Sequence, residues 1–188
     1  RKARGAAMVF APPEAATIAW IGLNSGAFPV ALFGAAIAGK PFAPLNYRLP
    51  DEQLLRIVAR TAPSIAIVDD DIAPRFAGGV PGVQFMTRSE FMAAAERDVA
   101  WAPPLNAGDP EDIAVLLFTS GTTGEPKAAV LRHRHLASYV ISTVEFMGSA
   151  EDEAALVSVP PYHIAAVSAV LTSTYGGRRV VHLEAFSP

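Results

Sequence analysis

Short apolar runs alternate with longer apolar or amphipathic stretches along most of the chain. Short apolar runs bounded by turn-forming residues are typical of buried strands, and apolar positions three or four apart are typical of helices. We predict strands over residues 17–23, 64–68, 83–86, 113–118, 128–131, 154–159 and 178–183, with a further short apolar segment at 41–45. Helices are predicted over residues 27–38, from a cap at Asp51 to a stop at Pro63, from a cap at Thr87 or Ser89 to about Arg97, and over residues 133–147 and 164–173.

The order of these elements predicts the fold class. Strands that are separated by helices are usually joined by right-handed crossovers and lie parallel in one sheet. The predicted fold is therefore α/β, with mostly parallel sheets flanked by helices.

Residues 15–39 carry no charged side chain, so a membrane-spanning helix has to be considered. A span needs about 20 consecutive apolar residues. The segment Asn24-Ser25-Gly26 interrupts the run, and each half is too short. We expect no transmembrane segment, but a buried strand, a cap at Asn24 or Ser25, and a buried helix that Gly39 ends.

The length of 188 residues fits one domain or slightly more. Residues 101–112 are rich in proline and glycine, which makes them the best candidate for an internal boundary. We therefore expect a first βαβ-type subdomain over residues 1–100, this connection, and a second subdomain over residues 113–188. The chain has no initiator methionine, and we expect it to be a piece of a longer protein, truncated at both ends.

Composition excludes several classes of protein. Hydrophobic residues make up 51% of the chain and charged residues 18%, so enough apolar surface is present to offset the entropy of ordering, and intrinsic disorder is excluded. The formal net charge of −3 gives no bulk attraction to nucleic acid. The absence of cysteine excludes a disulfide scaffold, a thiolate zinc site and a cysteine nucleophile, and we take the cytoplasm as the default location. The oligomeric state is left open.

Several conspicuous polar or aromatic residues receive structural interpretations. The run from Asp69 to Asp71 is interpreted as a solvated turn rather than a metal site, because no histidine or second carboxylate cluster accompanies it. The basic run from Arg132 to His135 is interpreted as the start of a helix rather than a nucleic-acid contact. Strand or packing roles without catalytic duty are expected for His182, Trp20 and Trp101.

The segment from Thr119 to Lys127 carries the candidate chemistry, directly after the strand predicted at residues 113–118. Glycines let a turn approach a ligand closely, and successive N–H groups in such a turn form a concave anion site. Hydroxyls donate to phosphate oxygens, and lysine adds a compact positive charge. A solvated turn is the alternative, but the position after a buried strand, where α/β sheets bind ligands, favours an anion site. The candidate binding residues are Thr119, Ser120, Gly121, Thr122, Thr123, Gly124 and Lys127.

Two common nucleotide motifs are absent from this segment. A Walker A loop has glycine before its lysine and Ser or Thr after it, whereas Pro126 precedes and Ala128 follows Lys127. The dinucleotide pattern G-x-G-x-x-G is also absent from the sequence.

The stretch from Leu117 to Lys127, LFTSGTTGEPK, resembles the phosphate-loop signature of the adenylate-forming (AMP-binding) superfamily, which includes acyl-CoA synthetases. Other segments resemble that family in the same order. These are Asn24-Ser25, Pro44-Leu45-Asn46-Tyr47-Arg48-Leu49, residues 131–136, Pro160-Pro161-Tyr162-His163, Gly176-Gly177-Arg178 and Phe186-Ser187-Pro188. The resemblance covers nearly the whole chain and implies a partial N-terminal domain of an adenylate-forming enzyme.

The resemblance also implies a reaction and roles for individual residues. The complete enzyme would use ATP and Mg²⁺ to convert a fatty or related carboxylic acid into an acyl-adenylate, and would then form a thioester with CoA. Residues Thr119 to Gly124 would hold the β- and γ-phosphates, with Thr119 near Mg²⁺. Lys127 would steady the departing pyrophosphate, and His163 would lie at the mouth of the acyl pocket. ATP, the acid and CoA are the expected partners, and no nucleic acid is expected.

The chain departs from the family pattern in two visible places. Ala128 and Ala166 stand where the family usually has glycine. The family's later motifs for adenine, ribose and Mg²⁺, and its C-terminal lysine, are not found in the sequence, so we expect little or no ligase activity from this chain alone. The alternative is a non-catalytic α/β module that binds phosphate or a partner protein. For His163 the alternative is a turn histidine satisfied by backbone, and a carrier-protein thiol remains an alternative to CoA.

Overall fold

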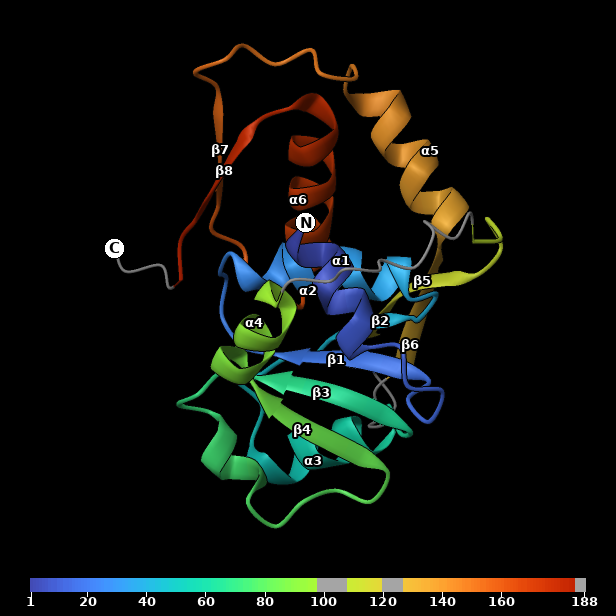
Figure 1. Ribbon diagram of the computed structural model, residues 1–188, viewed down its shortest axis with the longest axis vertical. Coiled ribbons are helices and arrows are strands. Elements are labelled where there is room, and N and C mark those ends of the chain that lie inside the picture. Colours follow the sequence, from blue (N-terminus) through green and yellow to red (C-terminus); the bar gives the residue numbers. More distant parts are fainter. Residues whose placement is uncertain (98–107, 120–126, 185–188) are drawn as a thin grey trace.

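The computed structural model describes residues 1–97, 108–119 and 127–184, and its centre is a twisted six-stranded sheet (Figure 1). The strands follow the order β4-β3-β1-β2-β5-β6. Neighbouring strands are parallel except for β5 and β6, which are antiparallel. The bounds are β1 (Thr17–Ile21), β2 (Phe42–Pro44), β3 (Ser64–Val68), β4 (Val83–Thr87), β5 (Ile113–Thr119) and β6 (Lys127–Arg132). The expected α/β fold with a mostly parallel sheet is confirmed.

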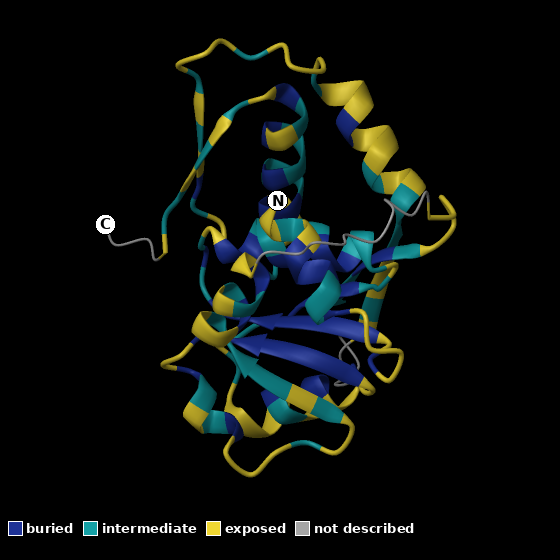
Figure 2. Ribbon diagram, viewed as in Figure 1, coloured by how far each residue is buried: buried dark blue, intermediate teal, exposed yellow. Residues whose placement is uncertain are grey.

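Helices cover both faces of this sheet. One face carries α1 (Lys2–Val9), α2 (Ala27–Ile37) and α4 (Arg88–Glu96), and the other carries α3 (Asp51–Ala59) and the short 3-10 helix η1 (Ala73–Phe76). Side chains alternate along β1: Ile18 and Trp20 join the core on the α2 face, and Ala19 and Ile21 join the core on the α3 face. All residues of β1 and β3 are buried (Figure 2), which explains why both strands appear in the sequence as uninterrupted apolar runs.

A second, two-stranded parallel sheet follows in the chain. It consists of β7 (Ala154–Val157) and β8 (Arg179–His182), which α6 (Ile164–Gly176) connects. Together with α5 (His133–Thr143), these elements extend beyond the main sheet at the top of Figure 1. The buried side chains of Val167 and Val170 attach α6 to the core on the α2 face. Helix α6 therefore anchors the C-terminal elements to the main sheet.

Helix α1 was not expected from the sequence, and close backbone packing explains its position. A Cβ atom added at Gly5 would lie 2.0 Å from the carbonyl oxygen of Ala95 in α4, so only glycine allows the two helices to approach this closely. The ring of Phe10, which directly follows α1, stacks on Phe91 of α4 with a centroid distance of 5.5 Å. Both rings are fully buried.

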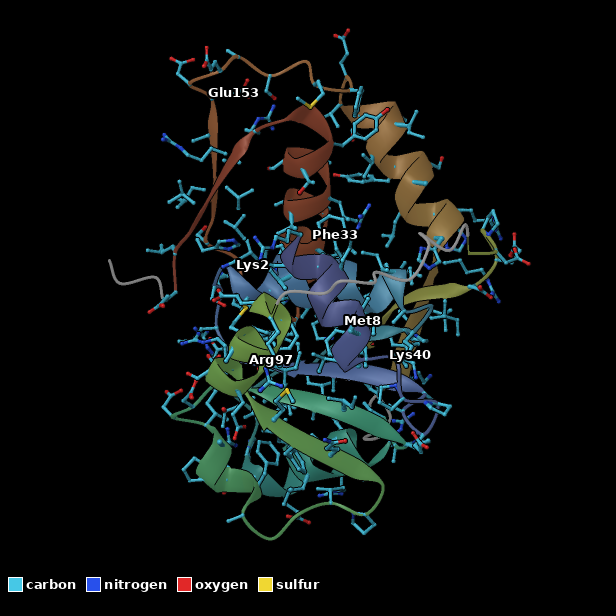
Figure 3. The ribbon with its side chains drawn as sticks, viewed as in Figure 1. Lys2, Met8, Phe33, Lys40, Arg97 and Glu153 are labelled. Atoms are coloured by element: carbon cyan, nitrogen blue, oxygen red, sulfur yellow. The ribbon has the colours of Figure 1, made fainter. Side chains whose placement is uncertain are left out.

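Helix α2 is the apolar segment that raised the possibility of a membrane span. It has 11 residues, and no helix in the described part of the chain is long and apolar enough to cross a membrane. Gly39 follows the helix with a φ of 68°, as its position in the sequence indicated. The next residue, Lys40, is labelled in Figure 3. Its Nζ donates to the carbonyl oxygens of Pro12 (2.6 Å) and Ala15. This contact ties the end of α2 to the segment before β1.

The starts of two helices differ from the prediction. Gly26, not Asn24 or Ser25, occupies the N-cap of α2, and no side chain caps that helix end. Asp51 is the first residue of α3 rather than its cap, and Pro50 occupies the N-cap. Asp51 still favours the helix start, because a carboxylate in the first turn interacts with the positive end of the helix dipole.

Several element ends also differ. Helix α5 ends at Thr143 rather than Met147, because Val144 is extended and Met147 has a φ of 52°. Helix α6 runs on to Gly176 rather than ending at Ser173, and Gly177 closes it with a φ of 77°. Strands β1, β7 and β8 each end one or two residues earlier than predicted.

Of the expected boundary at residues 101–112, residues 101–107 lie outside the described residues, and residues 108–112 lead into β5. After this boundary, β5 pairs with β2, with Val115 opposite Phe42, and extends the main sheet. The division into subdomains over residues 1–100 and 113–188 stays a prediction.

Candidate functional site

The predicted phosphate loop is closed at its base by an antiparallel strand pair. Thr119, the last residue of β5, pairs with Lys127, the first residue of β6. The Thr119 hydroxyl donates to the Lys127 carbonyl oxygen at 3.4 Å. Val115 and Leu117 are buried in β5, so the core fixes the strand that leads into the loop. The five predicted binding residues inside the loop, Ser120, Gly121, Thr122, Thr123 and Gly124, lie outside the described residues.

Both ends of the loop present side chains to solvent. Thr119 and Lys127 are exposed, and within the described part of the chain no carboxylate forms an ion pair with Lys127. A second cation lies near the loop base: the guanidinium carbon of Arg60 lies 5.5 Å from the ring centroid of Phe118, the residue before Thr119. Sequence reasoning did not single out Arg60, because the contact joins the end of α3 to β5, which are far apart in the chain.

His163 occupies the N-cap of α6 and is exposed. Its backbone N–H donates to the carbonyl oxygen of Pro160 at 3.0 Å, which closes the turn Pro160–His163. The centroid of its ring lies 4.6 Å from that of Tyr162. The Tyr162 ring in turn makes an edge contact with Tyr47, with a centroid distance of 5.7 Å. Tyr47 follows β2, so an aromatic row leads from the carboxyl end of β2 to the start of α6.

The predicted residues thus fall into two groups. Thr119 and Lys127 lie together at the base of the loop, and His163 lies beside Tyr162 and Tyr47. Among the residues that the structure describes, no hydrogen bond, ion pair or ring contact joins His163 to Thr119 or Lys127.

The residues that depart from the family pattern are accommodated by the fold. Ala166 is fully buried in α6, so the surrounding side chains pack around its methyl group. Ala128 is half-buried in β6, opposite Phe118 in the strand pair that closes the loop.

The other sequence interpretations have mixed outcomes. Trp20 is a packing residue, His182 ends strand β8, and α5 begins at His133, as expected. Trp101 lies outside the described residues. Arg132 and Arg134 both form ion pairs with Glu111, at nitrogen–oxygen distances of 3.6 and 2.7 Å. A carboxylate of the same chain therefore pairs with both charges. No group of potential metal-binding side chains was found among the described residues.

The interpretation of Asp69 as part of a solvated turn is wrong. Its side chain is 1% exposed. Its Oδ2 accepts a hydrogen bond from the backbone N–H of Leu23 at 2.7 Å, and its Oδ1 lies 3.1 Å from the Nη1 of Arg88. A Cβ atom at Gly22 would lie 2.5 Å from Asp69 Oδ1, so the loop after β1 packs directly on this carboxylate. Burial raises the pKa of Asp69, although the Leu23 N–H and Arg88 act in the opposite direction.

This raised pKa predicts a pH dependence of stability. The folded protein binds a proton at Asp69 more tightly than the unfolded chain does, so the contribution of this group is largest when the carboxyl is protonated. We expect the free energy of unfolding of the wild type to fall relative to that of Asp69→Asn as the pH rises from about 3.9 through the raised pKa. Urea unfolding of both proteins across the acidic range measures this difference. A difference that grows in favour of the wild type with rising pH would contradict the prediction.

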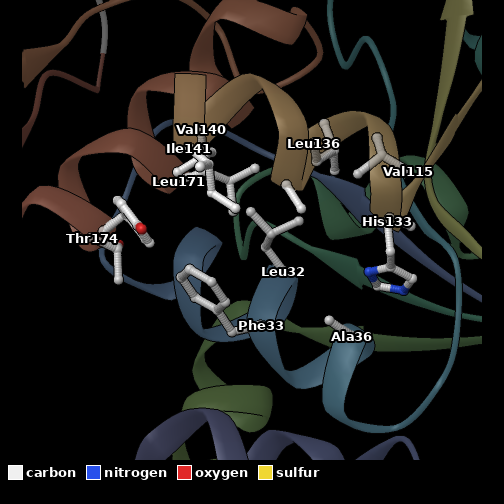
Figure 4. A pocket seen from close by; sticks show the side chains of 13 residues that line it. Leu32, Phe33, Ala36, Val115, His133, Leu136, Val140, Ile141, Leu171 and Thr174 are labelled. Atoms are coloured by element: carbon white, nitrogen blue, oxygen red, sulfur yellow. The ribbon is translucent and has the colours of Figure 1, made fainter. Parts of the chain in front are cut away.

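An apolar groove of about 380 Å³ lies among α2, α5 and α6 (Figure 4). Leu32 and Phe33 of α2, Leu136 and Val140 of α5, and Leu171 of α6 form much of its wall. It meets the later turns of α6, whereas His163 stands at the start of that helix and does not line it. The groove is therefore separate from the two groups of predicted site residues.

Comparison with known proteins places these features in a family. The profile of the AMP-binding enzyme family matches residues 13–188. A feruloyl-CoA synthase from an Amycolatopsis species is 33% identical over 173 residues, which cover 91% of this chain and 34% of that protein. A fatty acid–[acyl-carrier-protein] ligase, ScoC, from Streptomyces coeruleorubidus is 26% identical over 180 residues, or 90% of this chain and 34% of that ligase. The chain thus spans about a third of the length of these curated relatives.

Solved structures agree with this result. The N-terminal domain of FACL13 from Mycobacterium tuberculosis, solved with an inhibitor, has a TM-score of 0.83 and 25% identity, and the match covers 99% of this chain and 49% of that chain. ATP-bound MatB from Rhodopseudomonas palustris has a TM-score of 0.81 and 23% identity, with coverage of 99% and 39%. The described elements therefore share the fold of the FACL13 N-terminal domain and of the matching part of MatB.

Proposed function

The chain belongs to the AMP-binding enzyme family, and from that premise we propose that the full-length protein activates a carboxylic acid with ATP and transfers the acyl group to CoA. In the first step a carboxylate oxygen attacks the α-phosphorus of ATP, and the bond to the β-phosphate breaks to release pyrophosphate. In the second step the CoA thiol attacks the acyl carbon, the bond to AMP breaks, and the thiol proton is lost.

The observation that supports this proposal is the strand pair that brings Thr119 and Lys127 together at the base of the loop. Attack on a phosphate requires neutralised charge and correct positioning more than covalent help. Lys127 would place an ammonium beside the pyrophosphate as it leaves, and the loop from Thr119 to Gly124 would hold the β- and γ-phosphates. The Thr119 hydroxyl would supply an oxygen ligand for Mg²⁺, which prefers oxygen ligands.

His163 is proposed to act at the acid rather than at the phosphates. Its exposed ring stands at the start of α6, beside Tyr162, and is separate from the loop base. An imidazole there can donate a hydrogen bond to the carboxylate and orient it for attack. This role agrees with the two separate groups of residues, one for each substrate.

The proposal extends to the substrate class and the location. Relatives are named for feruloyl and fatty-acid substrates, and we propose a fatty or related acyl acid for this protein. The relatives' names also include a carrier-protein acceptor, and we propose CoA as the acceptor here. We propose a cytoplasmic location, where ATP and CoA are available.

The test is acid-dependent exchange of labelled pyrophosphate into ATP by the full-length protein. We expect exchange with one class in a panel of short-chain, long-chain and aromatic acids, none without acid or Mg²⁺, and thioester formation when CoA is added. If pyrophosphate exchange occurs but the acyl group goes to a carrier-protein thiol and not to CoA, only the proposed acceptor is wrong. No exchange with any acid would contradict the proposal and favour a non-catalytic module.

A further inference from the structure

Asn24 links the two sheets of the molecule. It follows β1 in the main sheet and is 2% exposed. Its side-chain Nδ2 donates to the carbonyl oxygen of Val159 at 2.9 Å and to that of Leu183 at 3.2 Å. Val159 lies just beyond the carboxyl end of β7, and Leu183 follows the last residue of β8. One buried amide on the main sheet therefore holds the ends of both strands of the second sheet.

The backbone that carries Asn24 is itself held in place. The N–H of Leu23 donates to the buried Oδ2 of Asp69 at the end of β3. Gly22 packs so closely on this carboxylate that a Cβ atom would lie 2.5 Å from Oδ1. The buried Asp69 carboxylate therefore fixes the backbone at Leu23, and with it the position of the next residue, Asn24.

The other end of this link leads directly to His163. Val159 is the residue before the Pro160–His163 turn, and α6 begins after it. The turn is anchored through α6 on its carboxyl side, through the Tyr162–Tyr47 contact in its middle, and through the Asn24–Val159 bond on its amino side. Loss of the amino-side anchor should free the turn and the second sheet to move while the main sheet remains formed.

From these contacts we propose that Asn24 is a positioning residue that holds the His163 turn against the main sheet. The inference rests on the role proposed above for His163 and deepens it. Asn24 does not touch the acid itself. Its amide sets where the His163 ring stands, and so affects binding of the acid more than binding of ATP.

A direct test is amide hydrogen exchange in full-length Asn24→Asp and Asn24→Ala. The aspartate variant turns an acceptor toward two carbonyl oxygens, and the alanine variant removes the donor without adding charge. We expect at least about tenfold faster exchange than in the wild type over residues 154–163 and 179–183, with β3 unchanged, because a lost buried hydrogen bond has an effect of this order. The control is Gln84→Glu, the same amide-to-acid change at an exposed position of β4, which should leave exchange unchanged.

A kinetic test separates positioning from a general loss of structure. In both Asn24 variants we expect the KM for the acid to rise about tenfold with the KM for ATP within about twofold, since misplacement of a group by a fraction of an ångström has effects of this size. In Asn24→Asp the defect should shrink from about pH 8 to about pH 5, because the protonated carboxyl can again donate to one carbonyl. In Asn24→Ala the defect should stay constant over this range.

The outcomes are distinguishable. Wild-type exchange in β7, β8 and the turn, together with an unchanged KM for the acid, would overturn the inference while the proposed function stands. Equal increases in both KM values without pH rescue would also overturn it, because they indicate a merely structural role. If the wild type shows no pyrophosphate exchange, the proposed function fails, and the hydrogen-exchange result alone decides whether Asn24 holds the turn. Should Asn24→Asp not fold, Asn24→Ala carries both measurements.

Discussion

Replacement of Lys127 by alanine should reduce acid-dependent pyrophosphate exchange by about 100- to 1,000-fold, because removal of one preorganised charge at a reacting phosphate has effects of this size. Lys127 begins β6 at the exit of the loop, opposite Thr119, and its side chain is exposed. Its loss leaves no cavity, so the free energy of unfolding should change by less than about 0.5 kcal/mol. Exchange assays and urea unfolding of the full-length protein measure the two effects.

Two further variants sharpen this experiment. Lys127→Arg keeps the charge but not the compact ammonium, and should retain an intermediate activity. Lys2→Ala removes an exposed lysine of α1 that pairs with Glu96 of α4, and it should retain wild-type exchange. Exchange within a few-fold of wild type in Lys127→Ala would remove Lys127 from the proposed site.

The largest effect on stability is expected from Phe91→Ala. Phe91 is fully buried and stacks on Phe10, so its ring joins α4 to the segment after α1. Removal of a buried phenylalanine ring leaves a cavity and costs about 3–5 kcal/mol. Urea unfolding of the full-length protein, followed by tryptophan fluorescence, can detect the change, because Trp20 lies in the same core.

Phe146→Ala is the matched control. Phe146 also makes an aromatic pair, with Tyr175 at 5.1 Å, but it is 66% exposed. Its removal should cost no more than about 1 kcal/mol, since exposed substitutions leave no buried cavity. A loss in Phe91→Ala as small as that in the control would show that the Phe10–Phe91 contact does not hold α1 and α4 in place.

Sequence predictions were accurate where neighbouring residues decide the structure, and they failed where contacts between distant parts of the chain decide it. Strand β3 and helix α2 were predicted within a residue, because apolar runs, glycine and proline act on the local chain. Helix α1 was missed because its stability comes from contact with α4, at the other end of the first hundred residues. Asp69 was misread as solvated, because nothing near it in the sequence indicates that the loop after β1 packs on it.

The candidate site divides in the same way. The stretch from Thr119 to Lys127 could be singled out as a candidate because its residues are consecutive in the sequence. The contacts of Asn24, Tyr47 and Arg60 could not be predicted, because each partner comes from a distant part of the chain. Asn24 was interpreted as a helix cap, which is the usual local use of such a residue, and a long-range bond took precedence.

By itself, the sequence determined the α/β fold class, the order of most elements and the location of the candidate phosphate loop, because periodicity and turn residues act over a few positions. The tertiary structure alone decided that β5 and β6 extend the first sheet, that Asp69 is buried, and that Asn24 reaches both strands of the second sheet. Such contacts form only when chain folding brings distant backbone groups together away from water, where each buried donor and acceptor must find a partner.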